Sequence, residues 1–205
     1  MSIANYTDLQ SSIASWMHRS DLTSVIPDFV ALCEARISRD LRLRRQVIPG
    51  TLATVAGTRS VTLPTDFLEA ENVSILNGDV EQNLEYATIE RIGIKYPDGA
   101  GDGVPQIYSY EDSNIILGPT PDAVYTVNLY YYAKIDALST TATNWLLTNH
   151  PNIYLFGSLA EAGDYVQSDA LVQKWEAKYK KGITELMLSD NNSMYGGSTL
   201  RVRTV

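Results

Sequence analysis

The sequence contains very little cysteine and histidine, and this scarcity excludes several kinds of chemistry. Among its 205 residues there is one cysteine, Cys33, and there are two histidines, His18 and His150. A single thiol cannot form an internal disulfide, and so few ligands cannot build a thiolate or imidazole metal cage. A reducing compartment is therefore the simplest location, and the sequence predicts neither a metal nor a cofactor.

Long apolar runs and an export signal are also missing. No stretch approaches the roughly 18 uninterrupted apolar residues that a membrane span requires. The opening residues, MSIANYTDLQ, lack a basic segment followed by an apolar one. We therefore expect no membrane partner.

The motifs of common catalytic sites do not occur. HExxH, GxSxG and GxxxxGK[ST] are absent, and no second His or Cys near His150 could complete a metal site. Asp98 and Asp102 lie among glycines, but their spacing does not follow the ligand ladder of a calcium loop. We interpret His150 as part of a helix start, and we expect no catalytic residues and no enzymatic activity.

Charge is distributed unevenly along the chain. The formal net charge of −8 disfavours general nucleic-acid binding, which depends on clustered Lys and Arg. Twelve acidic and two basic residues lie between Pro64 and Asp122, whereas five arginines and one acid lie between Arg36 and Arg45. These arginines could contact phosphate or an acidic protein, since guanidinium groups pair with both, or they could form a solvated helix face. The candidate partner-binding face consists of Arg36, Arg39, Arg42, Arg44 and Arg45.

Two helices are predicted in residues 1–45. Asn5 or Thr7 can cap the first helix and Ser24 the second, and Pro27 lies early enough in the second for its missing N–H to cost little. At helical spacing, the arginines of the second helix lie roughly opposite its apolar arc. That helix should therefore pack on one side and present guanidinium groups on the other. The apolar arc consists of Ile26, Val30, Cys33, Ile37 and Leu41.

From Gln46 onward the hydrophobic period changes to two, which indicates strands. A turn is expected at Gly57, a hairpin at Asn77-Gly78, and a short helix from Thr88 to Lys95. Three further strands are predicted between residues 107 and 135. The last of them carries bulky side chains on both faces, which is typical of a central strand.

Helical patterns return after Asp136. Asn149 can cap a helix whose first turn contains His150 and Pro151, and the segment from Ile153 to Gly163 is apolar nearly all round. Its small residues, Gly157, Ala160 and Gly163, lie on one narrow side. Neighbouring helices are therefore expected to approach this helix closely.

One carboxylate on that helix, Glu161, needs a partner if it is buried, and an arginine of the second helix is the expected one. A last amphipathic helix is predicted from Ser168 to Leu188. The final seventeen residues are polar and glycine-rich, so we expect them to lack structure in the free protein. Their alternating end, STLRVRTV, suits strand addition to a neighbour's sheet, although simple fraying is the plainer interpretation.

Together these patterns predict an α+β fold in which N- and C-terminal helices form one bundle with an inserted antiparallel β region. The predicted segments are residues 1–45 for the N-terminal helices, 46–135 for the β-rich insertion, 136–188 for the C-terminal helices and 189–205 for a flexible docking tail.

Three long stretches carry a resemblance to a known family. They are SWMHRSDLTSVIPDFVALCEARISRDLRLR (Ser15–Arg44), LPTDFLEAENVSI (Leu63–Ile75) and NWLLTNHPNIYLFGSLAEAGDYVQSDALVQKWEAKYKKGITEL (Asn144–Leu186). In matching order they resemble the head–tail adaptor (connector) proteins of tailed phages, and MYGGSTLRVR near the C-terminus is similar to those proteins too. The shared motifs are helical signatures rather than catalytic ones.

The resemblance implies a virion structural protein at the head–tail junction, made in the host bacterial cytoplasm. Such adaptors form a ring, typically of twelve copies, beneath the portal, extend the DNA channel and receive the tail. The implied partners are other copies of the chain, the portal protein, tail or tail-tube proteins, and double-stranded DNA passing without sequence specificity. By the same likeness the C-terminal segment would dock onto the portal, through Tyr195, Leu200, Arg201, Val202 and Arg203.

Two alternatives stay open. A tail-completion or gatekeeper protein would bind the tail side of the connector, and mapping the interface would separate it from an adaptor. A sequence-specific DNA-binding regulator would use the arginines between Arg36 and Arg45 and would bind free duplex tightly and in a salt-sensitive way. A small-molecule enzyme is disfavoured, because no acid, base and nucleophile converge in the sequence.

Overall fold

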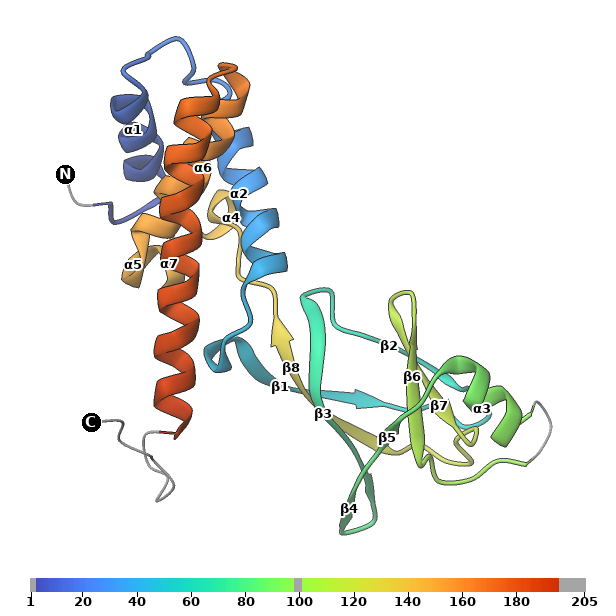
Figure 1. Cartoon of the computed structure of the whole chain (residues 1–205). Coiled ribbons are helices and arrows are strands. Elements are labelled where there is room, and N and C mark those ends of the chain that lie inside the picture. The colour runs from blue at the N-terminus through green and yellow to red at the C-terminus, as the bar shows by residue number, and fades with distance from the viewer. Residues whose placement is uncertain (1–2, 98–100, 196–205) are drawn as a thin grey trace. The chain divides into compact units, whose positions relative to one another are not determined.

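The chain folds into two compact units. The computed structural model describes residues 3–97 and 101–195. A helical unit comprises residues 1–43 and 135–205, and a strand unit comprises residues 44–134 (Figure 1). The helices of the helical unit are α1 (Tyr6–Met17), α2 (Ile26–Asp40), α4 (Leu138–Thr141), α5 (Trp145–Asn149), α6 (Pro151–Tyr165) and α7 (Asp169–Tyr195).

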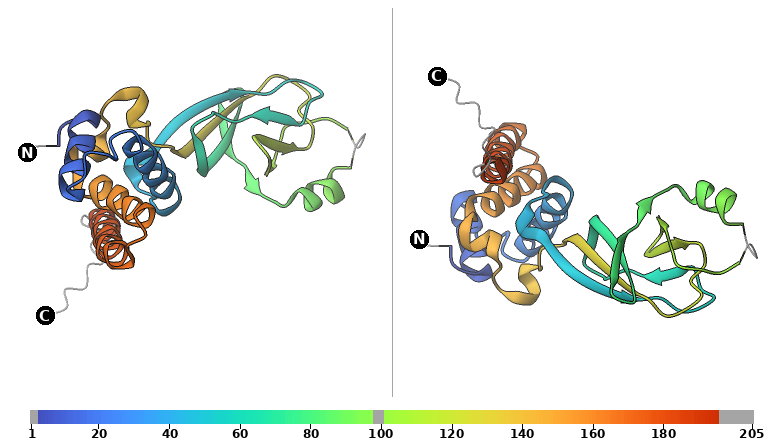
Figure 2. Two further views of the ribbon diagram at one scale, coloured as in Figure 1. Left: turned by 90° about the horizontal axis from the view of Figure 1, so that it is seen from above. Right: turned by 90° about the horizontal axis from the view of Figure 1, so that it is seen from below.

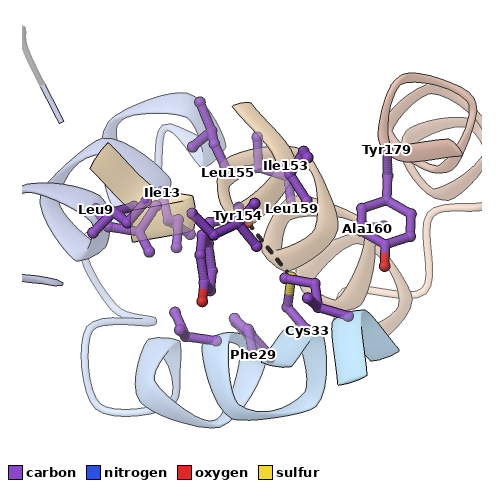
Figure 3. Packing of buried hydrophobic residues seen from close by; sticks show 14 of the residues in the cluster. Leu9, Ile13, Phe29, Cys33, Ile153, Tyr154, Leu155, Leu159, Ala160 and Tyr179 are labelled. Carbon is purple, nitrogen blue, oxygen red and sulfur yellow. Dashed lines mark hydrogen bonds between the residues drawn. The ribbon is translucent and has the colours of Figure 1, made fainter. Parts of the chain in front are cut away.

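The central helix of the helical unit is α6. It packs against α1, α2, α5 and α7, and the views along the helices in Figure 2 show it surrounded by α1, α2 and α7. This explains why its sequence is apolar nearly all round. Figure 3 shows side chains from these helices meeting around it, with Tyr154 of α6 between Ile13 of α1 and Phe29 of α2.

Close helix packing in this unit depends on glycine. A Cβ placed on Gly157 of α6 would overlap the Sγ of Cys33 in α2, and one on Gly163 would lie 3.1 Å from the backbone N of Val172 in α7. Neighbouring helices therefore approach these two positions as the sequence predicts.

The helix starts agree only in part with the prediction. Asn5 caps α1, where its Oδ1 accepts a hydrogen bond of 2.9 Å from the backbone N–H of Asp8. Ser24 does not cap α2, because that helix begins one residue later than expected, with Val25 as a cap that makes no side-chain hydrogen bond. Asn149 does not cap α6 either, since it ends the separate helix α5 and His150 is the N-cap.

The strand unit contains two four-stranded sheets. One has the order β1-β8-β3-β4 and the other β2-β7-β6-β5. Buried side chains from both sheets, including Ile75, Leu117 and Leu129, belong to one hydrophobic cluster. The elements are the 3-10 helix η1 (Arg44–Gln46), β1 (Val47–Ala53), β2 (Ser60–Thr62), β3 (Phe67–Asn77), β4 (Val80–Asn83), β5 (Glu85–Tyr86), α3 (Ile89–Lys95), β6 (Ile107–Glu111), β7 (Asn114–Gly118) and β8 (Thr126–Ala133).

The predicted fold class, a bundle of terminal helices with one inserted antiparallel β region, is wrong. Helices and strands are interspersed, because α3 lies between β5 and β6, and the strands form two sheets. The pairing of β5 with β6 is parallel, with Glu85 opposite Ile107 and Tyr86 opposite Tyr108. Parallel neighbours need a crossover connection, which the segment containing α3 supplies. A period of two identifies strands but not their partners.

Several local predictions in this unit are confirmed. The hairpin at Asn77-Gly78 joins β3 to β4, the short helix expected from Thr88 to Lys95 is α3, and β8 is central because it lies between β1 and β3. Thr88 is the N-cap of α3. The turn at Gly57 also exists, with a φ of +74°. The strands on either side of it join different sheets, however, since β1 pairs with β8 and β2 pairs with β7.

The last helix is longer than expected. α7 continues to Tyr195, so the expectation that the chain lacks structure from Ser189 is wrong for residues 189–195. No glycine or proline interrupts this stretch, and the first helix-ending signal in the sequence is Gly196-Gly197. The hydroxyl of Ser193 donates a 2.9 Å hydrogen bond to the carbonyl of Ser189, one turn earlier.

Candidate interaction surfaces

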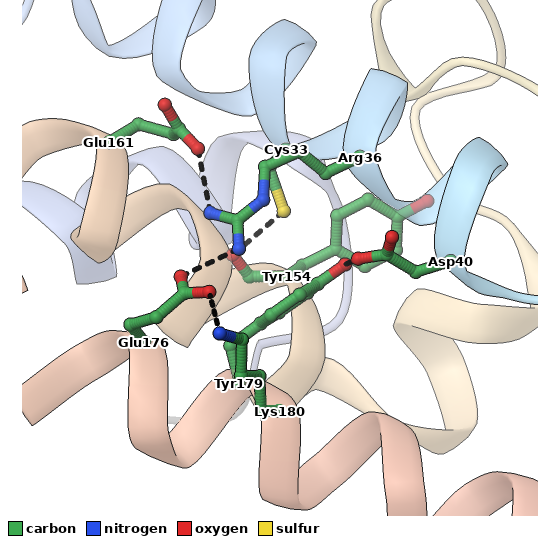
Figure 4. A network of polar contacts seen from close by, with 8 residues as sticks. All are labelled: Cys33, Arg36, Asp40, Tyr154, Glu161, Glu176, Tyr179 and Lys180. Atoms are coloured by element: carbon green, nitrogen blue, oxygen red, sulfur yellow. Dashed lines mark hydrogen bonds and ion pairs between the residues drawn. The ribbon is translucent and has the colours of Figure 1, made fainter. Parts of the chain in front are cut away.

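An ion-pair network joins three helices of the helical unit. The guanidinium of Arg36 on α2 donates to Glu161 of α6 at 2.8 Å and to Glu176 of α7 at 2.6 Å (Figure 4). The ammonium of Lys180 lies 3.3 Å from the other oxygen of Glu176. The predicted pairing of Glu161 with an arginine of the second helix is therefore confirmed, and Arg36 points into the unit rather than outward.

The charges of this network stabilise one another. Partial burial opposes ionisation of Glu176, but the hydrogen bond and charge of Arg36, followed by those of Lys180, lower the pKa of this carboxyl. Burial also opposes the charge of Arg36, and its two carboxylate partners nevertheless raise the pKa of the guanidinium. The network is satisfied from within the unit and has the character of a structural ion pair.

The groups beside this network are buried and chemically inert. Burial raises the pKa of the Cys33 thiol to about 12, so it is not a thiolate at neutral pH. The Arg36 guanidinium lies over the ring of Tyr179, 4.5 Å from the ring centroid. The Tyr179 hydroxyl donates a 3.0 Å hydrogen bond to the carboxylate of Asp40. These contacts fix α7 against α2 and provide no nucleophile.

Both histidines lie at helix ends. His150 is the N-cap of α6, which agrees with its interpretation as part of a helix start, and His18 is the C-cap of α1 with a left-handed φ of 52°. Within residues 3–97 and 101–195, no group of three His, Cys, Asp or Glu side chains is placed to hold a metal ion. The same ranges contain no helix with the length and apolar character needed to span a membrane.

The structure does not gather the five arginines of the candidate partner-binding face on one helix. Arg36 is held by carboxylates, and Arg39 is exposed near the end of α2. The guanidinium of Arg42 donates to the carbonyls of Ser38 and Leu41, which are at the end of the same helix. Arg44 and Arg45 are exposed and belong to η1 in the strand unit.

A cluster of aromatic rings and lysines forms a second surface of the helical unit, which we call the lysine–aromatic surface (Trp16, Phe156, Lys174, Trp175 and Lys178). Phe156 stacks on Trp175 with ring centroids 5.7 Å apart, and Trp16 lies 5.4 Å from Trp175. The ammonium groups of Lys174 and Lys178 lie 4.4 and 4.8 Å from the Trp175 centroid, within the range of cation–π attraction. Trp16 remains 45% exposed.

A pocket of about 370 Å³ adjoins this surface. Trp175 is only 4% exposed, and its indole N–H has no hydrogen-bond partner in the part of the chain that the structure describes. A buried donor without an acceptor is energetically unfavourable. The pocket combines positive charge with aromatic rings, and its lining is Ser15, Trp16, His18, Lys174 and Trp175.

In the strand unit, the most exposed apolar position of the first sheet is at the tip of a hairpin, which we call the hairpin tip (Asn77–Glu81). Gly78 and Asp79 form its two-residue turn, and Val80 is 61% exposed on the edge strand β4. Glu81 accepts hydrogen bonds from the Ser74 hydroxyl at 2.6 Å and from the Asn128 amide at 3.0 Å. These hydrogen bonds lower the pKa of Glu81, so it stays ionised.

The predicted docking tail lies mostly outside the described residues. Tyr195 is the last residue of α7, and Leu200, Arg201, Val202 and Arg203 are not among the residues that the structure describes. Before that end, α7 exposes Met187 and Leu188, which are 37% and 55% exposed.

Sequence reasoning missed the lysine–aromatic surface. It predicted an amphipathic last helix from Ser168 to Leu188 but no surface that joins this helix to the first one. The sequence did contain one indication of this surface. Lys174 is next to Trp175 and Lys178 follows it by three residues, so on a helix both lysines lie close to the tryptophan. Nothing in the sequence indicated that α1 would bring a third ring to this position.

Comparison with known proteins gives one finding that covers almost the whole chain. A family model described as SU10 adaptor protein matches residues 4–203, which include both units. No curated protein matches the chain.

Proposed function

Because the chain belongs to the SU10 adaptor protein family, we propose that this phage adaptor is a head–tail adaptor that assembles into a ring beneath the portal. The match confirms the resemblance to phage head–tail adaptors that the sequence carries. In this proposal the ring, of twelve copies by likeness to other adaptors, extends the DNA channel at the head–tail junction of the virion and joins the tail.

The observation that carries this proposal is the extent of the family match, from residue 4 to residue 203. A structural role is also supported by ionisable groups of the helical unit that pair with one another or are buried. Arg36, Glu161 and Glu176 neutralise one another, and the Cys33 thiol is buried. We therefore propose that the protein acts by assembly and not by catalysis.

Passage of DNA is compatible with the charge of the chain. The net charge of −8 and the acidic segment between Pro64 and Asp122 repel phosphates, which favours sliding over gripping. DNA would then pass through the ring without sequence-specific contacts.

Portal docking is assigned to the C-terminal end. Met187 and Leu188 expose apolar surface on the last turns of α7, and the chain continues for ten residues beyond Tyr195 with Leu200, Arg201, Val202 and Arg203. We propose that this segment binds the portal. The exposed Arg39, together with Arg42, Arg44 and Arg45, would contact acidic protein partners, whereas Arg36 serves within the helical unit.

The proposal is tested by electron microscopy of the purified protein with and without portal protein. Rings attached to portal are expected, and a subunit that stays single in both preparations would contradict the proposal. A variant lacking residues 196–205 should keep its tryptophan fluorescence but fail to co-sediment with filled, portal-bearing heads. Retention of wild-type co-sedimentation would reject the docking role of the tail.

The two alternatives differ in what they bind. A tail-completion protein would bind connector-bearing heads only after another adaptor is in place. A DNA-binding regulator requires one continuous arginine face, but Arg36 is held by two carboxylates and Arg44 and Arg45 belong to the other unit. Titration of a free duplex at low and high salt separates the regulator from the adaptor, because only the regulator should bind tightly.

A further inference from the structure

The lysine–aromatic surface has the chemistry of a site for an apolar side chain next to a negative charge. Trp16 is 45% exposed although it contacts the Trp175 ring. The ammonium group of Lys178 lies 6.0 Å from the Trp16 ring centroid, and that of Lys174 lies 4.4 Å from the Trp175 ring centroid. The buried indole N–H of Trp175 lacks an acceptor among the described residues. Exposed tryptophan is enriched at the centre of protein interfaces, whereas charged side chains such as lysine belong to the rim around it.

The hairpin tip presents the complementary combination. Val80 projects from an edge strand with 61% of its surface exposed, and Asp79 and Glu81 flank it. All four residues of β4 are exposed. The hairpin also belongs to the acidic segment, in which twelve acidic and two basic residues lie between Pro64 and Asp122.

We propose that the hairpin tip of a second copy of this chain docks on the lysine–aromatic surface. Val80 packs against Trp16, and the carboxylate of Asp79 lies between the ammonium groups of Lys174 and Lys178. The two surfaces differ, so each subunit offers one to each neighbour, and repetition of the contact closes a ring when the rotation allows. This inference rests on the ring of the proposed function and names the surfaces that join its subunits.

Charge reversal tests the contact. Lys174→Glu combined with Lys178→Glu should weaken self-assembly by about tenfold or more, and Asp79→Lys should do the same, because like charges then meet. An equimolar mixture of the two variants should assemble again, since each hairpin then finds an oppositely charged surface. Sedimentation velocity with portal protein present measures the ring fraction.

Matched controls separate this contact from a general effect of charge. Lys181→Glu changes an exposed lysine of the same helix, which lies 3.7 Å from Glu185, and Glu71→Lys changes an exposed acid on β3. Both should assemble like wild type. Unchanged assembly of the Lys174/Lys178 variant, while wild type forms rings, overturns this inference alone; the absence of rings from wild type overturns the proposed function.

Site-specific cross-linking provides a second measurement that does not depend on loss of assembly. Cys33 is buried, so a cysteine introduced on the surface is the only accessible thiol in the described part of the chain. Oxidation of a mixture of Val80→Cys and Ser15→Cys proteins should give a disulfide-linked heterodimer. Val124→Cys, at a position of the strand unit that is 72% exposed, is the control partner. A heterodimer yield no higher than with that control would overturn the contact.

Discussion

In the helical unit, the core is built around one central helix, whereas in the strand unit the core is shared between two small sheets. Side chains of α1, α2 and α7 converge on α6, and glycines allow the helices to approach closely. In the strand unit the largest cluster lies between the sheets, and α3 covers a smaller separate one. Close packing makes the first unit sensitive to added volume, while the second has exposed edges that tolerate change.

The tryptophans make this comparison measurable. All three, Trp16, Trp145 and Trp175, belong to the helical unit. Fluorescence during chemical denaturation therefore reports on the helical unit, and amide hydrogen exchange reports on the strands separately.

The largest expected effect is on the packing of α6. Gly157→Val should destabilise the helical unit by about 3 kcal/mol or more, because its Cβ would overlap Cys33 Sγ and lie 3.1 Å from the Tyr179 ring. Tryptophan fluorescence in a denaturant titration measures the loss. Exchange of amides in the central strand β8 serves as the control and should be unchanged; a wild-type midpoint would show that the helices do not pack closely at this position.

The second effect concerns the ion-pair network. Arg36→Met should cost about 2 kcal/mol at pH 7, less than a fully buried pair, because about a fifth of each side chain is exposed. The same denaturant titration measures it. Adding Glu161→Gln and Glu176→Gln to Arg36→Met should recover part of the loss, since no uncompensated carboxylate then remains. No recovery would show that the arginine acts through packing alone.

This network also gives a pH dependence with a defined sign. The folded-state pKa of Glu176 is lowered, so its contribution is present above the unfolded-state pKa of about 4.3 and is lost as the pH falls through the folded value. The difference in stability between wild type and Arg36→Met should therefore shrink below about pH 4. A difference that stays constant down to pH 3 would contradict this assignment.

The pattern of agreement between sequence and structure follows from the range of the interactions. Asn5, Thr88 and the turn at Gly78 act on residues two or three positions away, so local spacing predicts them. The parallel pairing of β5 with β6 and the assignment of β1 and β2 to different sheets depend on contacts far along the chain. Periodicity carries no information about those partners.

The candidate surfaces illustrate the same limit. A buried carboxylate requires a cation, so an arginine partner for Glu161 was predictable. Helical periodicity, however, placed Arg36 on the outer face of the second helix. In the structure both α6 and α7 provide carboxylates on that side of α2. The lysine–aromatic surface needed three helices to meet, and no single stretch of sequence contains it.

A smaller effect is expected from removing a helix N-cap, and such a cap can be compared in each of the two units. Asn5→Ala removes the acceptor for the Asp8 N–H and should cost the helical unit about 1 kcal/mol. Thr88→Ala removes the acceptor of the weaker 3.3 Å hydrogen bond from the Arg91 N–H and should leave the tryptophan transition unchanged while increasing amide exchange in α3. A shift of the tryptophan transition by Thr88→Ala would show that the two units unfold together.

The smallest expected effect is an increase in stability, and it concerns two glycines within helices. Gly93 lies in α3 with no heavy atom within 4 Å of an added Cβ, so Gly93→Ala should stabilise that helix by about 0.5 kcal/mol. In α7, an added Cβ on Gly182 would lie 3.2 Å from the Asn152 amide and 3.4 Å from Ile153, and this crowding should offset the gain from Gly182→Ala. Slower amide exchange in α3 measures the first change, and an unchanged or lower midpoint of the tryptophan transition measures the second. If both substitutions increased stability equally, α7 would not be packed more closely at Gly182 than α3 is at Gly93.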